Sequence, residues 1–360
     1  MKPLDVVVLG CTGLVGRRFV RRLAEHPWFH LTGLAASARS AGRSYGELVP
    51  HLERRLPARI LAMRVMDMED IPALAAKSRL AFSALPRDIA GETETGLRQR
   101  GVMVFSNAAA HRLDEEVPIL VPEVNPDHLE MARFQLQAYG GAIVTNPNCV
   151  AAGLAPVLAP LLPMGLKQVH LVTFQALSGA GLKGPRALAM QGNILPFIEE
   201  EEEKICREIR RILGNREGDH IRPLELEVTV SCNRVPVIHG HMLSVTAHME
   251  ATVSEKRILR AIASINEESR KMNLPGSPAA LLEVTRQPDR PQPRLDVDAG
   301  GPGMGTGMTV SIGRLRTRGT LVSFTALVNN LERGAAGGSI LNAELALCRG
   351  VIPEAGGGIP

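Results

Sequence analysis

The sequence predicts an α/β protein in which an N-terminal doubly wound parallel sheet precedes a second α+β domain with a mixed sheet. Three observations support this fold class. The chain has 360 residues, which is too long for one ordinary core. Up to residue 145, short apolar runs alternate with helix-like segments, as in βα repeats. Beyond Cys149, longer strand-like runs follow one another, which is typical of a mixed or antiparallel sheet.

The first strand-like run leads directly into a glycine-rich turn. Residues 6–9 read VVVL, residues 10–16 read GCTGLVG, and a helix with a basic face follows. In a Rossmann-like fold, Gly10 allows the tight turn, Gly13 lets the backbone approach a pyrophosphate, and Gly16 permits close helix packing. We therefore predict a dinucleotide site here. An ordinary βα turn remains the alternative.

The second strand is expected at residues 30–36 and ends in the segment SARS at residues 37–40. Folds that prefer NAD usually carry an acidic residue here, bonded to the ribose hydroxyls. This chain instead offers Arg39 and the hydroxyls of Ser37 and Ser40. These groups favour the 2′-phosphate of NADP(H) as ligand, because guanidinium binds phosphate well. A solvated loop arginine is the alternative.

Further strands are expected at residues 80–86 and 102–107, so that Gly10, Ser37, Leu85 and Asn107 border a crevice at the carboxyl ends of the strands. The second sheet is expected to use residues 169–177, 224–230, 242–249, 309–316 and 321–328. Five glutamates at 199–203 predict a solvated helix start, residues 287–307 a long loop, and residues 338–349 a last helix. We predict a cofactor domain at 1–148, completed by 333–350, and a catalytic and dimerisation domain at 149–332.

Composition excludes several classes of function. The formal net charge is only +4. The sequence shows no clustered basic patch of the kind that would predict nucleic-acid binding. The five cysteines are scattered and form no CxxC, which argues against a disulfide framework and a metal site. The N-terminus resembles a first strand and not a signal peptide. The uncharged stretch 136–166 contains several prolines and amides, so we expect a buried turn and helix and not a membrane span. A reducing, cytoplasmic location fits best.

Cys149 follows the segment TNPN at 145–148 and precedes an apolar, helix-like run at 150–162. A thiol at a helix N-terminus faces unpaired N–H groups and the positive end of the dipole, which favour thiolate. The same N–H groups, with Asn148, are able to stabilise an oxyanion. Pro156 is expected to kink the helix. The alternative is a small buried cysteine that starts a structural helix.

Four other motifs stand in a fixed order around this cysteine. They are the segment SNAAAHR at 106–112 followed by VPEVN at 121–125, QALSGAG at 175–181, SCNRVPVIHGH at 231–241, and RGAAG at 333–337. Together with the glycine-rich turn and the segment DRPQPRLD at 289–296, they resemble the aspartate-β-semialdehyde dehydrogenase family, above all its archaeal and fungal branch. The resemblance extends from Val6 to Glu344.

The resemblance implies roles for individual residues. Cys149 matches the nucleophile, His241 the general acid/base, Gln175 the residue that orients the substrate, and Arg234 the arginine that binds its carboxylate. By composition alone, His239 is as good a base as His241. Substrate and phosphate contacts are implied for Arg112, Glu201 and Lys204, although the glutamate run leaves the register of the last two open. Cofactor contacts are implied for Gly10, Thr12, Gly13, Leu14, Val15, Ser37, Arg39, Ser40, Ser178, Gly179 and Asn342.

The implied reaction is the NADP-dependent reductive dephosphorylation of L-4-aspartyl phosphate to L-aspartate 4-semialdehyde, and its reverse, through a Cys149 thioester. It belongs to lysine, methionine and threonine biosynthesis. The implied partners are this small substrate, phosphate and a second copy of the chain, as a homodimer or homotetramer.

Departures from the family pattern leave the acyl substrate open. They include His239, Met242 and Leu243 beside His241, Val150 after the nucleophile, and Leu182-Lys183 after the segment QALSGAG. An acyl-CoA reductase similar to malonyl-CoA reductases is therefore an alternative. N-acetylglutamyl-phosphate reductases match less well. A non-catalytic NADP-binding paralogue is the alternative from another class.

Overall fold

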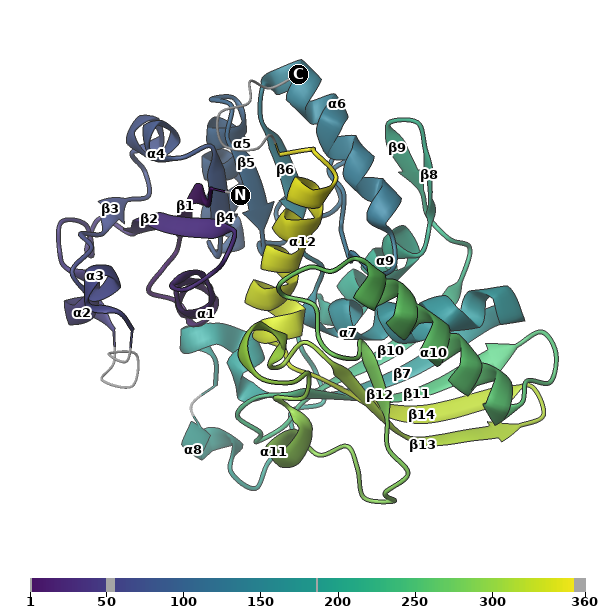
Figure 1. Ribbon diagram of the computed structural model, residues 1–360. Coiled ribbons are helices and arrows are strands. Elements are labelled where there is room, and N and C mark those ends of the chain that lie inside the picture. The colour runs from purple at the N-terminus through teal and green to yellow at the C-terminus, as the bar shows by residue number, and fades with distance from the viewer. Residues whose placement is uncertain (1, 50–55, 186, 353–360) are drawn as a thin grey trace.

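The computed structural model describes residues 2–49, 56–185 and 187–352, and it contains two six-stranded sheets (Figure 1). The first sheet is entirely parallel, with the strand order β3-β2-β1-β4-β5-β6. Its strands are β1 (Leu4–Leu9), β2 (Phe29–Ala36), β3 (Met66–Asp67), β4 (Leu80–Ser83), β5 (Met103–Ser106) and β6 (Ala142–Thr145). The order reverses between β1 and β4, and that switch point opens a ligand crevice at the carboxyl ends. The predicted doubly wound sheet is confirmed.

Helices cover both faces of this sheet, as a parallel sheet requires. One face packs against α1 (Leu14–Leu23), α6 (Glu130–Tyr139) and α12 (Gly337–Cys348), and the other against α4 (Ile71–Lys77) and α5 (Arg87–Arg98). Short helical turns complete this half of the chain: α2 (Tyr45–Leu48), α3 (Ala58–Leu61) and η2 (Pro126–Leu129). Helix α12 is the last helix, yet it lies on the first sheet (Figure 1).

Four phenylalanine side chains pack together in this core. Phe82 on β4 is fully buried, and its ring centroid lies 5.2 Å from that of Phe19 and 5.8 Å from those of Phe29 and Phe105. Aromatic rings bury large areas and add a favourable pair geometry. This cluster therefore fixes α1 against the strands whose ends form the crevice.

The second sheet is mixed, with the order β10-β7-β11-β14-β13-β12. Its strands are β7 (Leu166–Gln175), β10 (Glu227–Arg234), β11 (His241–Met249), β12 (Leu282–Val284), β13 (Val310–Arg318) and β14 (Leu321–Val328). The pairs β10–β7 and β12–β13 are parallel and the other pairs are antiparallel. One face packs on α7 (Cys149–Leu158), α9 (Glu201–Ile212) and α10 (Glu255–Lys271). The predicted mixed sheet is confirmed.

Shorter elements join these parts. They are η3 (Ala159–Met164), η4 (Leu177–Lys183), α8 (Ala187–Met190), α11 (Pro293–Asp296), η5 (Gly303–Gly305) and the π-helical turn η6 (Glu332–Ala336). A small hairpin, β8 (Asn215–Glu217) and β9 (His220–Arg222), had no counterpart among the expected strands. Its polar residues carry no apolar alternation, so periodicity could not reveal it. Helix α7 passes through Pro156 and becomes the 3₁₀ helix η3 at Ala159.

Buried polar contacts connect the C-terminal elements to the first half of the chain. Glu344 of α12 accepts from His26 Nε2 at 2.8 Å and from the Gly276 N–H at 2.9 Å. Arg22 of α1 donates to Glu332 at 2.5 Å and to the carbonyls of Met304 and Thr306. The basic face of α1 thus holds the glycine-rich loop around residue 304. Within the described ranges, no helix has both the length and the apolar character needed to cross a bilayer.

The aromatic cluster predicts a large cost of truncation. Phe82→Ala should lower the free energy of unfolding by about 3–5 kcal/mol, because it leaves a cavity among three other rings. The matched control is Phe134→Ala on α6, where the side chain is 44% exposed; its effect should stay within about 0.5 kcal/mol. Denaturant unfolding curves measure both values. Equal losses for the two variants would contradict the inferred core.

Candidate active site

The nucleophile candidate stands where the last strand of the first sheet passes into the second half of the chain. Strand β6 ends at Thr145, a turn follows, and α7 begins at Cys149. The side chain of Asn148 caps this helix, since its Oδ1 accepts the Val150 N–H at 2.8 Å. Cys149 therefore occupies the first helical position, as the turn residues predicted.

A hollow of about 420 Å³ opens over Cys149 and gathers residues from both halves of the chain. The first half contributes the end of the glycine-rich turn and the loop after β5, and the second half contributes the carboxyl ends of β7 and β10. The lining residues are Val15, Asn107, Arg112, Asn148, Cys149, Gln175, Ser178, Gly179, Ala180, Ile198, Glu199, Glu201, Arg234, Asn330, Leu331, Gly334 and Ala335. Gln175 and Arg234 are register partners on the parallel strands β7 and β10, so the pairing of the sheet brings them together.

The glutamate run resolves into separate roles. The carboxylate of Glu201 lies in the hollow and is hydrogen-bonded there. Its Oε1 accepts from Asn148 Nδ2 at 2.9 Å and from Gln175 Nε2 at 3.0 Å. Glu202 accepts the Cys232 N–H at 2.7 Å. Glu200 pairs with Lys204 at 2.9 Å and with Arg87 at 3.2 Å. The predicted helix start is confirmed at Glu201, and Glu199, Glu200 and Glu203 are exposed as expected. Glu201 and Glu202 are half-buried and hydrogen-bonded, because the first turn of α9 faces the start of α7.

Asn148 has both ends of its amide engaged. Its oxygen caps α7 and its nitrogen donates to Glu201. In this arrangement Asn148 orients the helix start and the carboxylate, while the backbone N–H groups of α7 are the donors nearest to an oxyanion on Cys149. The amide donor predicted for an oxyanion is here committed to Glu201.

Arg234 brings a buried positive charge to the hollow. Its Nη1 donates to the Ala176 carbonyl at 2.8 Å. Gly179 lies directly over it: a Cβ at this position would stand 2.8 Å from Arg234 Nη1 and 3.0 Å from His241 Nε2. Only glycine therefore lets the η4 turn pass over the arginine and the histidine.

His241 is fully buried, and its tautomer follows from one hydrogen bond. The Ala176 N–H donates to His241 Nδ1 at 3.0 Å, so a neutral ring carries its proton on Nε2. Among the described residues Nε2 has no partner. Burial, followed by the charge of Arg234, lowers the pKa of His241 to about 3. At neutral pH the ring is thus an uncharged hydrogen-bond donor.

The surroundings of His239 argue against it as the general acid/base. It is half-buried, and its pKa is lowered by burial and by Arg18, with Asp298 and Glu332 acting in the opposite direction. Arg18 belongs to α1, Asp298 to the loop before η5, and Glu332 to η6. Neither histidine lines the Cys149 hollow, but His241 lies against Gly179, which does. This position favours His241, whereas composition alone left the choice open.

The thiol of Cys149 is not activated in this arrangement. Its pKa is raised to about 12, first by burial and then by the charge of Glu201, while Arg112, Arg234 and the Val150 N–H act in the opposite direction. The helix N-terminus acts in the predicted direction, since the Val150 N–H lowers the pKa, but burial and the neighbouring carboxylate outweigh it and the two cations. The residue itself keeps some exposure to the hollow.

Arg112 lies between this hollow and a smaller one of about 240 Å³. Its Nη1 donates to Glu208 at 3.0 Å and its Nη2 to the Asn107 carbonyl at 2.8 Å. The smaller hollow is lined by Arg87, Ala109, Arg112, Leu113, Glu200, Glu203, Lys204, Arg207 and Glu208. Lys204 thus lies beside the Cys149 hollow, and Glu200 holds its ammonium group there.

Sequence reasoning overlooked Glu208, Asn330 and Gly334. Glu208 stands seven residues after Glu201, on the same face of α9, and that spacing was the available signal. Asn330 donates to Ser178 Oγ at 2.8 Å. A Cβ on Gly334 would lie 2.6 Å from that of Cys149, so the return of the chain at η6 needs glycine. No sequence pattern links these distant positions.

The glycine-rich turn fits a dinucleotide. Gly10 has φ +73°, and a Cβ on it would stand 2.6 Å from the Ala84 carbonyl; one on Gly16 would collide with the Gly10 carbonyl. Gly13 has open space, with the nearest atom of another residue 3.5 Å from a Cβ, so a pyrophosphate can approach its backbone. Val15 leads from this turn into the Cys149 hollow.

The other predicted cofactor residues differ in their exposure to solvent. Ser37 and Arg39 are exposed after β2, Ser40 is half-buried, and Thr12 and Leu14 are half-buried in the turn. Ser178 and Gly179 line the Cys149 hollow. Asn342 is buried in α12 beside Asn146 and Arg333, outside that hollow.

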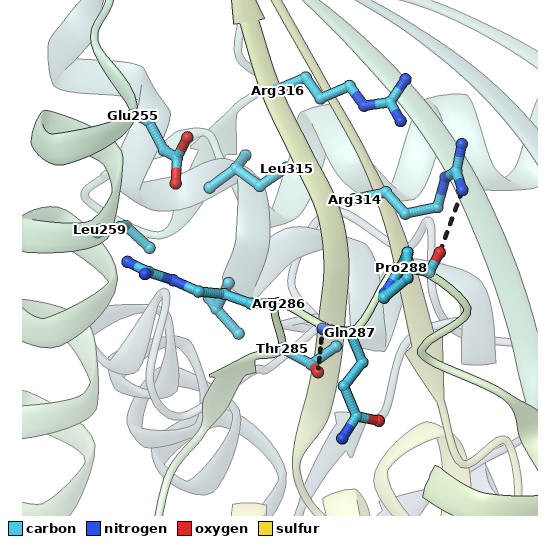
Figure 2. Close-up of a pocket in the computed structure, with 10 residues that line it drawn as sticks. Glu255, Leu259, Thr285, Arg286, Gln287, Pro288, Arg314, Leu315 and Arg316 are labelled. Atoms are coloured by element: carbon cyan, nitrogen blue, oxygen red, sulfur yellow. Dashed lines mark hydrogen bonds between the residues drawn. The ribbon is translucent and has the colours of Figure 1, made fainter.

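A larger hollow, of about 720 Å³, lies at the edge of the second sheet, between α10 and β13. Figure 2 shows that its arginines diverge: Arg286 points toward Leu259, while Arg314 and Arg316 lie on the other side of their strand. It holds no nucleophile and no histidine. In the described part of the chain, no group of three or more His, Cys, Asp or Glu side chains is arranged to hold a metal ion.

Comparison with known proteins agrees with the fold. The family model "Semialdehyde dehydrogenase, NAD binding domain" matches residues 5–132, and "Semialdehyde dehydrogenase, dimerisation domain" matches 158–332. An aspartate-semialdehyde dehydrogenase of Archaeoglobus fulgidus is 44% identical over 97% of this chain and 99% of its own length. A malonyl CoA reductase (NADP) of Metallosphaera sedula is 34% identical over 98% and 99%.

A solved structure extends the likeness to three dimensions. The crystal structure of aspartate semialdehyde dehydrogenase with NADP from Candida albicans has a TM-score of 0.86 and 32% identity, covering 97% of this chain and all of that one. The likeness spans both sheets and the turn between them. This chain therefore belongs to the aspartate-semialdehyde dehydrogenase family.

Proposed function

We propose that this protein interconverts L-aspartate 4-semialdehyde and L-4-aspartyl phosphate, with NADP(H) as hydride carrier and Cys149 as nucleophile. The observation that carries the proposal is the single hollow in which Cys149 meets Glu201, Gln175 and Arg234, with His241 beneath Gly179. The relatives named above support the same reaction, which belongs to the biosynthesis of lysine, methionine and threonine. NADP(H), when bound, takes up or supplies the hydride at the acyl carbon.

Substrate recognition follows from charge. An amino acid substrate carries an α-carboxylate and an α-ammonium group. Arg234 binds the carboxylate through its guanidinium, whose donors are suited to two oxygens. Glu201 binds the ammonium group, and Asn148 and Gln175 hold its carboxylate in place for this contact. The two charges of the site thus match the two charges of the substrate.

Substrate binding also prepares the nucleophile. Glu201 is the charge that raises the pKa of Cys149, while Arg112 and Arg234 lower it. An ammonium group on Glu201 offsets that negative charge, which shifts the balance toward thiolate. Burial remains the largest cause of the raised pKa, and substrate binding offsets only the contribution of Glu201.

In the tautomer that Ala176 sets, His241 Nε2 already carries a proton, so this atom acts as a hydrogen-bond donor, and the general acid/base role of His241 remains a prediction. The neutral ring offers its Nε2–H to the oxygen of the tetrahedral adduct on Cys149, together with the N–H groups at the start of α7. In the phosphorylating direction, a phosphate oxygen bonds to the thioester carbon, the C–S bond breaks, and the sulfur leaves as thiolate. Arg112 holds the phosphate for this step, and Lys204 joins it once its ammonium group leaves Glu200.

An acyl-CoA reductase is the second candidate, favoured by the likeness to a malonyl CoA reductase. Against it stands Glu201, because a malonyl group has no ammonium to pair with this half-buried carboxylate. The altered residues beside His241 give little support to a different substrate. Neither Met242 nor Leu243 lines the hollow, and Leu243 is fully buried. A non-catalytic binder would not need the whole set of polar side chains.

We further propose that the chain acts as a homodimer or homotetramer, assembled through its second half. The match to a dimerisation domain supports this. So do exposed apolar side chains in that half, among them Val172, Leu188, Phe197 and Ile238. The sheet clusters and the matched ranges also support domain limits at 1–148 with 333–350, and 149–332. Five free thiols fit the reducing cytoplasm that we propose as location.

The reaction is tested by NADP⁺ reduction with aspartate semialdehyde, with and without phosphate. We expect NADPH only with phosphate and a loss of more than about 10³-fold in Cys149→Ala, because the covalent step is removed. Cys348→Ala, an exposed thiol outside the hollow, should keep wild-type rates. Turnover that needs coenzyme A in place of phosphate would instead support the acyl-CoA reductase.

The role of Glu201 predicts opposite effects on two measurements. Glu201→Gln removes the charge that raises the pKa of Cys149, so alkylation by iodoacetamide at pH 8 without substrate should become faster. The same variant should lose about 10- to 100-fold in kcat/KM, because the ammonium contact is gone. Slower alkylation together with lost activity would contradict the proposed electrostatic effect.

Cofactor choice is tested at Arg39. Arg39→Ala should raise KM for NADP⁺ by about 10- to 100-fold, because one charge-assisted bond to the 2′-phosphate is lost. NAD⁺ lacks that phosphate, and its KM in the same variant is the internal control. A parallel rise for both cofactors would assign Arg39 to folding of the loop.

A further inference from the structure

Glu208 is a buried carboxylate of α9 that the proposed chemistry does not use. It is 2% exposed, it lies beside the smaller hollow, and it does not line the Cys149 hollow. Its two oxygens have different partners: Oε1 accepts from Arg112 Nη1 at 3.0 Å, and Oε2 accepts the Asn148 N–H at 2.5 Å. One side chain thus joins positions 112, 148 and 208.

The first contact fixes the anion-binding arginine. Glu208 and the Asn107 carbonyl each take one terminal nitrogen of Arg112, so both ends of the guanidinium are anchored. Arg112 Nε is buried without a partner among the described residues, and the side chain lines both hollows. An anchored guanidinium meets an anion in one orientation and loses little freedom on binding.

The second contact fixes the turn that carries the nucleophile. Asn148 precedes Cys149, caps α7 and holds Glu201, so a shift of its backbone would move all three groups. The Glu208 carboxylate sets the distance between this turn and Arg112. In the phosphorylating direction these are the two partners that must meet, since phosphate on Arg112 attacks the acyl group on Cys149.

A buried carboxylate is a costly way to fill space. Burial raises the pKa of Glu208, and Arg112 and the Asn148 N–H act in the opposite direction. An apolar residue of similar size would often give equal or greater stability at such a place. A carboxylate is nevertheless suited to accept from two donors on opposite sides, which no apolar side chain does.

We propose that Glu208 is a positioning residue for acyl transfer to phosphate, acting through Arg112 and the Asn148 backbone without touching the substrate. The inference rests on the proposed function. It predicts that the phosphate-dependent half of the reaction is more sensitive to Glu208 than cofactor binding is.

The test is Glu208→Gln in the full-length protein. Glutamine has one acceptor oxygen, so its NH₂ group must face either Arg112 or the Asn148 N–H, and one of the two bonds is lost. We expect KM for phosphate to rise on the order of 10- to 100-fold, as for a misplaced reacting group, while KM for NADP⁺ stays unchanged. Inorganic phosphate should also protect Cys149 from alkylation less well in the variant.

A double-mutant cycle separates positioning from general damage. If Glu208 acts through Arg112, Glu208→Gln should add little to KM for phosphate once Arg112→Gln is present. The matched control is Glu344→Gln, a fully buried carboxylate of α12 that contacts His26 and Gly276. It should alter thermal stability without changing KM for phosphate.

Two outcomes would overturn the proposal. One is a Glu208→Gln protein with a lower melting temperature and wild-type kinetics for phosphate; the other is full additivity with Arg112→Gln. If the glutamine variant does not fold, Glu208→Asp keeps the charge on a shorter arm, and a wild-type KM for phosphate there would also overturn it. Absence of phosphate-dependent turnover in the wild type would reject the proposed function, whereas phosphate protection of Cys149 tests Glu208 without turnover.

Discussion

The turn between β6 and α7 constrains the whole site, because every polar group of Asn148 on that turn is committed. Its N–H donates to Glu208, its side-chain oxygen caps α7 at Val150, and its side-chain nitrogen donates to Glu201. Both glutamates lie on α9, whose apolar face packs with α7 in one core cluster. The position of Cys149 therefore depends on the packing of two helices that are distant in sequence.

Charge balance around the thiol follows from this arrangement. Glu201 approaches from α9, Arg112 from the loop after β5, and Arg234 from the end of β10. His241 adds no charge at neutral pH, because burial and Arg234 lower its pKa. Arg112 pairs with Glu208, whereas Arg234 bonds to a backbone carbonyl and Glu201 to two side-chain amides. A substrate with one charge of each sign would complete the site. Reactivity of the thiol is thus linked to recognition of the substrate.

Much of the fold could be predicted because local patterns agree with the final structure. The strand-turn-helix around Gly10 and the cysteine after the segment TNPN depend on neighbours in sequence. The hairpin β8–β9 and the three roles within the glutamate run could not be predicted. Polar residues on a hairpin leave no periodic signal, and five equal side chains leave their register to the helix that packs opposite them.

The sequence by itself determined the fold class, the dinucleotide turn, and the place of Cys149 at the start of a helix, since each rests on short-range geometry. Tertiary structure decided which glutamate is hydrogen-bonded inside the Cys149 hollow, that His241 lies against Gly179, and that Lys204 pairs with Glu200. It also decided protonation: the thiol has its pKa raised and the imidazole has its pKa lowered. The reason is physical, because burial and Coulomb interactions depend on residues that only folding brings together.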